Sequence, residues 1–238
     1  MTLADGRLVG FEALVRWNHP HLGEVEPLRF IPIAEETGFI VPLGRWVLVE
    51  ACEQLAAWSA ESGTALTLSV NLSRRQLIST YLIDEVRTAL ALSGVDPHQL
   101  MLEVTESVLM EDPAQAIRAL SELRSLGIRI AVDDFGTGYS SLSHLQRFPV
   151  DVLKIDKSFI DPLAGQDEES RALVTAILGL AATLGLEVIA EGIEHQSQLH
   201  HLVELGCHRG QGFLMARPLD TEAAVHYIAE SSRSAVVG

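Results

Sequence analysis

The sequence predicts one α/β domain built around a barrel of parallel strands. Short apolar runs rich in Val, Ile and Leu alternate with longer helical patterns, which is typical of repeated βαβ units. The runs contain few polar positions, as expected for strands that are covered on both faces. Nearly every run is followed by a polar or charged residue, and a barrel gathers these carboxyl ends at one mouth. No linker divides the 238 residues, so we expect one domain over residues 1–230 and a frayed tail over residues 231–238.

Seven strands are expected, with helices between them. The strands cover residues 7–15, 66–71, 100–104, 128–133, 152–155, 187–190 and a short segment near 207–213. The helices cover residues 40–59, 78–93, 113–125, 168–184 and 196–205. Asp112 and Pro113 start the third helix, because aspartate caps a first turn and proline suits the first helical position. Four helices end at glycines, which adopt the left-handed conformation that stops a helix: Gly94, Gly127, Gly185 and Gly206.

Acidic residues outnumber basic ones by 32 to 17, which gives a formal net charge of −15. This excess argues against DNA or an anionic membrane surface as the main partner, although a site that holds divalent cations can still bind an anionic substrate. Cys52 and Cys207 lie far apart and predict no disulfide, which favours a reducing cytoplasm. No signal peptide is expected, because Asp5 and Arg7 interrupt the N-terminus before an apolar stretch forms. No membrane span is expected, because the longest uncharged stretch, between Arg171 and Glu187, is too short for a bilayer.

The carboxyl ends of the predicted strands carry a group of polar, mostly acidic residues. They are Asn71, Glu103, Glu106, Asp133, Asp134, Lys154, Asp156 and Glu191. Clustered carboxylates repel one another, so a site that gathers them usually holds cations. Carboxylates with one amide oxygen favour Mg²⁺ or Mn²⁺ over zinc. The adjacent pair Asp133 and Asp134 suits two bridged metals, which are typical of phosphoester hydrolysis.

Three neighbouring features have both a functional and a plainer interpretation. Lys154 can polarise an attacking water or offset charge on a phosphate, or it can form a structural salt bridge. Arg16, which follows the strand that carries Glu12, can bind a substrate phosphate or form a surface ion pair. Residues 135–141 are a gating loop or an ordinary glycine turn. The nine histidines form no Cys/His cluster, and no Gly-x-Ser-x-Gly segment occurs, so zinc and serine-hydrolase chemistry have no support.

A series of short motifs extends over about residues 5–219. In chain order they are FEALVRW, FIPIAEETG, VNLS, LEVTES, AVDDFGTGYSSL, LKID, AEGIE and QGF followed by RPL. This series resembles that of EAL domains, the bacterial phosphodiesterases of the second messenger cyclic di-GMP. The resemblance implies a TIM-type (β/α)8 barrel with one antiparallel strand, and hydrolysis of cyclic di-GMP to linear pGpG with two divalent ions, Mg²⁺ or Mn²⁺.

The resemblance also assigns roles to single residues. The implied metal-binding residues are Glu12, Asn71, Glu103, Asp133, Asp134 and Glu191, although Glu191 is left open as general base or as metal or water ligand. Lys154 resembles the lysine that contacts the attacking water, and Asp156 resembles its supporting carboxylate. Glu106 resembles the anchor of the loop after the aspartate pair. The implied substrate-binding residues are Leu14, Arg16, Asp156 and Gln211, and Glu194 matches a further active-site position.

The chain departs from the family pattern at its start, where family members carry one more strand. A seven-stranded barrel has two unpaired edges, so the N-terminal residues or a neighbouring copy fill the gap, or the chain is a fragment. The segment from Gly206 to Gly210 also departs from the pattern, with an effect expected on packing alone.

The family resemblance further implies a homodimer, attachment to a sensory or diguanylate-cyclase-like domain, a cytoplasmic location and no contact with DNA or a membrane. Two alternatives to an active phosphodiesterase remain. One is a catalytically silent receptor for cyclic di-GMP or a protein-interaction module, although such domains usually lack residues that are present here. The other is a different metal-dependent barrel enzyme, such as an enolase-like lyase, and the series of motifs argues against it.

Overall fold

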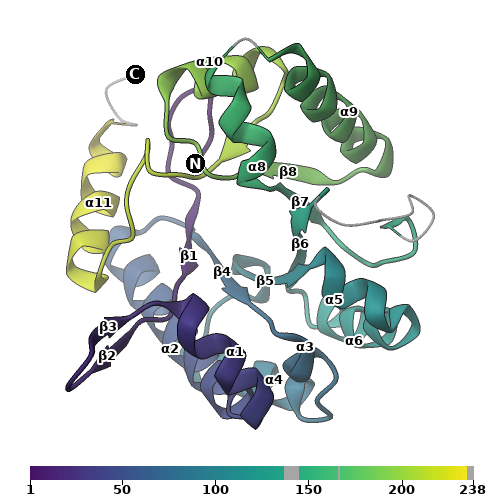
Figure 1. The fold of residues 1–238 in the computed structure, drawn as a ribbon. Coiled ribbons are helices and arrows are strands. Elements are labelled where there is room, and N and C mark those ends of the chain that lie inside the picture. Colours follow the sequence, from purple (N-terminus) through teal and green to yellow (C-terminus); the bar gives the residue numbers. More distant parts are fainter. Residues whose placement is uncertain (137–144, 166, 235–238) are drawn as a thin grey trace.

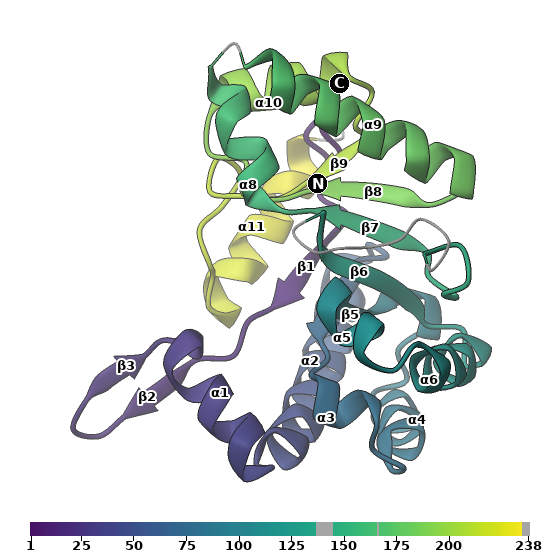
Figure 2. The same cartoon turned by 45° about the vertical axis from the view of Figure 1, so that its right-hand side comes forward.

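The computed structural model describes residues 1–136, 145–165 and 167–234. Within them, seven parallel strands form one curled sheet in the order β1-β4-β5-β6-β7-β8-β9 (Figures 1 and 2). They are β1 (Gly10–Ala13), β4 (Thr67–Asn71), β5 (Leu100–Thr105), β6 (Arg129–Phe135), β7 (Val152–Ile155), β8 (Glu187–Ala190) and β9 (Arg209–Gly210). The predicted barrel of seven strands is therefore confirmed as a half-barrel whose carboxyl ends share one mouth.

Helices surround this sheet. They are α1 (Pro27–Thr37), α2 (Ile40–Ser62), α3 (Arg74–Leu77), α4 (Leu82–Ser93), α5 (Glu106–Glu111), α6 (Pro113–Ser125), α8 (Lys157–Ile160), α9 (Glu168–Leu184), α10 (Gln196–Glu204) and α11 (Thr221–Ser234), with the 3-10 turns η1 (Pro97–Gln99) and η2 (Asp161–Ala164). The predicted bounds of α6 and α9 are confirmed. Each begins behind an aspartate whose carboxylate accepts a backbone N–H of the first turn: Asp112 from Gln115 and Asp167 from Ser170. None of the described helices is both long and apolar enough to span a bilayer.

Several described elements were not predicted, including the short helices α3, α5 and α8. A short antiparallel hairpin, β2 (Trp17–His19) and β3 (Gly23–Val25), forms a sheet of its own, so the strand expected over residues 7–15 ends at Ala13. It escapes a pattern search because six strand residues are too few to show an alternation. The helices α1 and α11 were also missed. Residues 231–234, which we expected to fray, continue α11, whose Ala224 and Ile228 are buried.

The residues before β1 fill part of the gap between β1 and β9, the two ends of the sheet. Thr2 forms an antiparallel bridge with Arg209 of β9. Met1 and Gly210 exchange backbone hydrogen bonds of 2.9 and 3.0 Å, and the Thr2 N–H donates to the Arg7 carbonyl at 2.9 Å. In these residues the antiparallel strand that the resemblance implies is reduced to the single bridge at Thr2. Of the three expected ways to close the barrel, the structure shows the first, over the length of these residues.

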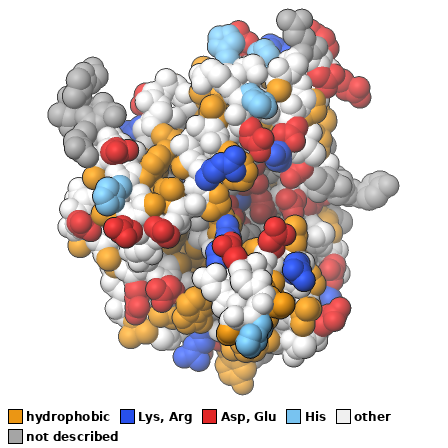
Figure 3. Space-filling view, turned by 60° about the vertical axis from the view of Figure 1, so that its left-hand side comes forward, with side chains coloured by type: hydrophobic (Ala, Val, Ile, Leu, Met, Phe, Trp, Pro, Cys, Tyr) orange, Lys and Arg blue, Asp and Glu red, His pale blue; other side chains and the backbone are white. Residues whose placement is uncertain are grey.

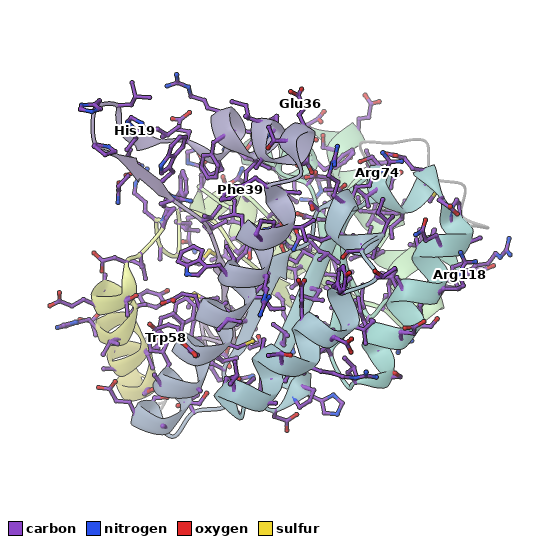
Figure 4. The ribbon with its side chains drawn as sticks, turned by 90° about the horizontal axis from the view of Figure 1, so that it is seen from below. His19, Glu36, Phe39, Trp58, Arg74 and Arg118 are labelled. Atoms are coloured by element: carbon purple, nitrogen blue, oxygen red, sulfur yellow. The ribbon has the colours of Figure 1, made fainter. Side chains whose placement is uncertain are left out.

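Above residues 1–3 the sheet remains open. A cavity of about 1000 Å³ extends along β1 toward the mouth. Its wall includes Phe11 of β1, whose ring centroid lies 5.1 Å from that of Trp58, and Tyr227 of α11. Trp58 lies on the end of α2 that is nearest to α11 (Figure 4). Its buried indole N–H has no acceptor among the described residues.

Candidate active site

The site is built by the alternation of side chains along the parallel strands. Met101, Ala131 and Val152 form a small apolar cluster with Ile189, separate from the main core. Side chains two positions apart on a strand point to the same face of the sheet. The next residues on that face are Glu103 of β5, Asp133 of β6, Lys154 of β7 and, directly after β8, Glu191. One apolar layer in the barrel is therefore followed by one charged layer at the mouth.

Lys154 lies at the centre of this charged layer. Its Nζ atom is 2.5 Å from Oε2 of Glu103, 2.6 Å from Oε1 of Glu191, 3.3 Å from Oδ1 of Asp133 and 3.7 Å from Oε2 of Glu12. We call these four acidic side chains the acid ring. The Lys154 side chain is only 2% exposed and Glu103 is fully buried, so bulk water barely screens these contacts.

Two amide side chains connect the acid ring across the open side of the barrel. Asn71 at the end of β4 donates from Nδ2 to Oε1 of Glu12 at 2.8 Å. Gln211, directly after β9, donates from Nε2 to Oε2 of Glu12 at 2.8 Å and to Oε1 of Glu191 at 3.0 Å. Gln211 therefore joins the two ends of the sheet, which share no backbone pairing in the described residues.

Burial determines the ionisation of the acid ring. Burial raises the pKa of Glu103 to about 7 and that of Glu191 to about 8, although the Lys154 ammonium acts in the opposite direction. Burial also opposes the charge of Lys154, but the carboxylates of Glu103, Glu12, Glu191 and Asp133 outweigh it and raise the Lys154 pKa. The lysine therefore stays charged, while Glu103 and Glu191 hold their protons to a higher pH than exposed carboxyls do.

The aspartate pair lies at an irregularity of β6. The register of β6 against β7 shifts between Val132 and Phe135, and Asp134 adopts a φ of 54°. This left-handed conformation is uncommon outside glycine but accessible to aspartate. The backbone N–H of Asp134 donates to Oδ1 of Asp133 at 3.0 Å. Burial and the neighbouring Asp133 and Asp156 raise the pKa of Asp134.

The donor set of the site fits hard divalent cations. Its atoms are carboxylate and amide oxygens, and Oε1 of Glu103 is buried without a hydrogen-bond partner among the described residues. However, no three acidic or histidine side chains of the described segments form a ready metal-binding group. Lys154, Asn71 and Gln211 engage some of the carboxylate oxygens of this region, while Oε1 of Glu103 is left unengaged.

The remaining predicted residues lie farther from Lys154. Glu106 is 3% exposed and its Oε2 accepts the backbone N–H of Gly136 at 3.0 Å, directly after the strand that carries the aspartate pair. Most of the predicted gating loop over residues 135–141 lies outside the described residues. Asp156 caps α8 by accepting the N–H of Ser158 at 3.0 Å. The charged layer and these neighbours thus occupy one connected region.

The rim of the mouth carries the predicted Leu14, Arg16 and Glu194, which line the same cavity. Leu14 is 47% exposed. Arg16 has its Nε 3.6 Å from Oε1 of Glu24 on β3, which is the surface ion pair that we weighed. Glu194 accepts from Nζ of Lys157 at 2.5 Å. Figure 3 shows acidic side chains inside a hollow with Lys and Arg side chains at its border.

Sequence reasoning missed three rim residues. Lys157 follows the LKID motif, and its aliphatic stem passes over Gly192, where a Cβ would lie 2.4 Å from Lys157 Cγ. Arg217 places its guanidinium carbon 4.8 Å from the ring centroid of Phe213, and both line the cavity. The available signal was their position, because Phe213 and Arg217 lie within the QGF and RPL motifs and Lys157 directly follows LKID.

Comparison with known proteins gives a consistent assignment. The model of the EAL domain family matches residues 1–218. The bifunctional diguanylate cyclase/cyclic di-GMP phosphodiesterase MucR of Pseudomonas aeruginosa is 44% identical over 94% of this chain and 33% of its own length. The cyclic di-GMP phosphodiesterase PA2567 of the same organism is 43% identical over 91% of this chain and 37% of its own length. The chain therefore spans about a third of the length of these curated relatives.

A solved structure extends the comparison to the fold. The PaMucR phosphodiesterase in complex with c-di-GMP superposes with a TM-score of 0.87 at 46% identity, over 92% of this chain and 88% of that one. This agreement is one of overall fold across most of both chains.

Proposed function

The chain belongs to the EAL domain family, and on this premise we propose that it hydrolyses one phosphodiester bond of cyclic di-GMP to give linear pGpG, with two divalent ions, Mg²⁺ or Mn²⁺. The observation that carries the proposal is the acid ring, which gathers Glu12, Glu103, Asp133 and Glu191 around Lys154 at the mouth. Only cations can make such a ring attractive to a phosphodiester, because the carboxylates alone repel it.

The proposed metal ligands are those predicted from the sequence: Glu12, Asn71, Glu103, Asp133, Asp134 and Glu191. When bound, the ions would neutralise the phosphate and lower the pKa of the attacking water. Lys154 supplies a charged donor that orients this water or counters charge on the phosphate. Gln211 holds the carboxylates of Glu12 and Glu191 in one orientation. Glu106 supports the chain after the aspartate pair through its bond to Gly136.

The rim supports binding of a guanine dinucleotide. Arg16 can exchange its long contact with Glu24 for a phosphate, which accepts the paired N–H groups of a guanidinium. Leu14 and the pair of Phe213 and Arg217 present apolar and cationic faces on which a purine can stack. Asp156 and Glu194 offer acceptors for the base or sugar donors.

The experiment is a chromatographic assay of purified protein with cyclic di-GMP and Mg²⁺ or Mn²⁺. We expect pGpG to accumulate, its formation to stop on chelation and to resume when the ion is restored. Glu12→Ala should remove the activity, because it removes one proposed ligand and the acceptor of Asn71 and Gln211. Metal-loaded, folded protein that yields no pGpG would contradict the proposal. Tight binding of cyclic di-GMP without turnover would instead assign the receptor function.

The wider context is proposed from the relatives. The expected sensory or diguanylate-cyclase-like domain accords with the bifunctional name of MucR and with its greater length. The homodimer, the cytoplasmic location and the domain boundary at residue 230 remain predictions, as do control of biofilm formation and motility.

A further inference from the structure

The chain has only two lysines, Lys154 and Lys157, and both lie at the mouth. Lys157 is 45% exposed and its Nζ contacts Glu194 at 2.5 Å and Asp161 at 3.9 Å. Lys154 is 2% exposed and its Nζ lies within 4 Å of four carboxylates from four strand ends. The two side chains thus differ in burial and in the number of acids that share their charge.

From this geometry we infer that Lys154 is the resident counter-cation of the acid ring, and that divalent ions must compete with its ammonium for the same carboxylate oxygens. The inference rests on the proposed metal-dependent function. It differs from a role in orienting water, because it concerns the state of the protein before any substrate is bound. It assigns to Lys154 control over metal affinity and over the stability of the metal-free fold.

The contacts explain why we expect competition. Oε2 of Glu103 and Oε1 of Glu191 lie 2.5 and 2.6 Å from Nζ, so the ammonium takes one lone pair of each of these oxygens and repels a cation at the remaining ones. The Lys154 stem extends from β7, an interior strand of the sheet, and is buried, so the ammonium cannot withdraw into solvent. A divalent ion among these oxygens therefore has to loosen the lysine contacts and also withstand its positive charge.

The lysine also supplies a compensating positive charge for the acid ring from within the protein. The Glu103 side chain is buried and that of Glu191 is only 16% exposed. When these carboxyls are ionised, their charges need a partner inside the protein. Lys154 is the cationic side chain within 4 Å of them in the described residues. Removing its charge should leave an uncompensated ring that binds divalent ions more tightly and folds less stably without them.

The first experiment follows the two lysines directly by NMR of protein with ¹³C-labelled lysine. The spectrum contains two Cε signals, and the assignment comes from Lys157→Met. Addition of Mg²⁺ should shift the Lys154 signal with a saturating titration curve and leave the Lys157 signal in place. A Lys154 signal that stays unchanged at Mg²⁺ concentrations that saturate binding in calorimetry would overturn the inference.

The second experiment compares Lys154→Met with the matched control Lys157→Met, which also breaks a 2.5 Å lysine–glutamate contact but outside the acid ring. By calorimetry with Mg²⁺ or Mn²⁺, we expect Lys154→Met to bind at least about tenfold more tightly than the wild type. Its melting temperature in chelator should fall by about 5 °C or more below that of the wild type. Added metal should raise the melting temperature of Lys154→Met by more than it raises that of the wild type. Lys157→Met should match the wild type in both measurements.

The outcomes separate this inference from the proposed function. Equal or weaker metal binding by Lys154→Met overturns the competition, even if the wild type hydrolyses cyclic di-GMP. Binding of no divalent ion by any of the three proteins overturns both the competition and the proposed metal requirement. Should Lys154→Met fail to fold in chelator, Lys154→Gln, which keeps a polar donor without the charge, provides the same affinity comparison. Tighter binding by either variant, with the NMR shift, supports the inference.

Discussion

The acidic side chains at the two ends of the parallel strands are paired with cations in different ways. At the amino ends, Glu187 accepts from Arg129 and Arg209 at 2.9 Å each, and Asp151 pairs with Arg124 at 2.8 Å. At the carboxyl ends, the four acids of the acid ring share the ammonium of Lys154. The amino-end acids each have a guanidinium partner, whereas burial raises the pKa of Glu103 and Glu191 at the mouth. The ion pairs at the amino ends therefore stabilise the fold, whereas the carboxyl ends gather acidic side chains whose ionisation burial disfavours.

The largest expected effect lies at the mouth. Asp133→Asn removes a charge from the acid ring and should lower kcat/KM for cyclic di-GMP by at least about a thousandfold, or ~4 kcal/mol of transition-state stabilisation. Its free energy of unfolding in chelator should stay equal or rise, because the substitution relieves repulsion within the ring. Steady-state kinetics and urea unfolding measure the two quantities. A variant that retains more than a tenth of the activity would show that Asp133 is not needed at the reacting centre.

A second prediction concerns pH. The folded-state pKa of Glu191 is raised from 4.5 to about 8, so its contribution to stability is present below pH 4.5 and is lost as pH rises through 8. Between pH 5 and 8 the metal-free wild type should therefore lose on the order of 1–3 kcal/mol more stability than Glu191→Gln. Urea unfolding in chelator at several pH values tests this difference. If stability depends on pH in the same way in both proteins, the pKa of Glu191 is not raised in the folded state.

The smallest expected effect lies at the amino ends. Glu187→Gln weakens two ion pairs to Arg129 and Arg209 that are partly exposed, so solvent screening limits the loss of stability to about 1 kcal/mol. The melting temperature should fall by roughly 2–4 °C, and less at high salt. Turnover of cyclic di-GMP should remain at the wild-type level. A loss of activity without unfolding would show that the two ends of the strands are coupled, and the comparison above would fail.

The predictions from sequence succeeded where the signal was local. The predicted cap at Asp112 and the predicted stop at Gly185 are short-range signals, and they help to set the bounds of α6 and α9. The helices α1 and α11 were missed because their stability comes from packing, including contacts with α2, rather than from a clear period. The hairpin β2–β3 was missed because its strands are too short to show an alternation, and its Trp17 ring packs 5.7 Å from that of Phe30 on α1.

The sequence by itself determined the order of strands and helices, the family, and which polar residues follow each strand. Alternation along a strand is enough to place Glu103, Asp133 and Lys154 on the inner face, because side chains two residues apart point the same way. Only the tertiary structure decided that Lys154 lies within 4 Å of four carboxylates, that Gln211 joins Glu12 to Glu191, and that residues 1–3 pair with β9. These contacts depend on the curvature of the sheet and on pairing between residues as far as 209 positions apart, which no local pattern encodes.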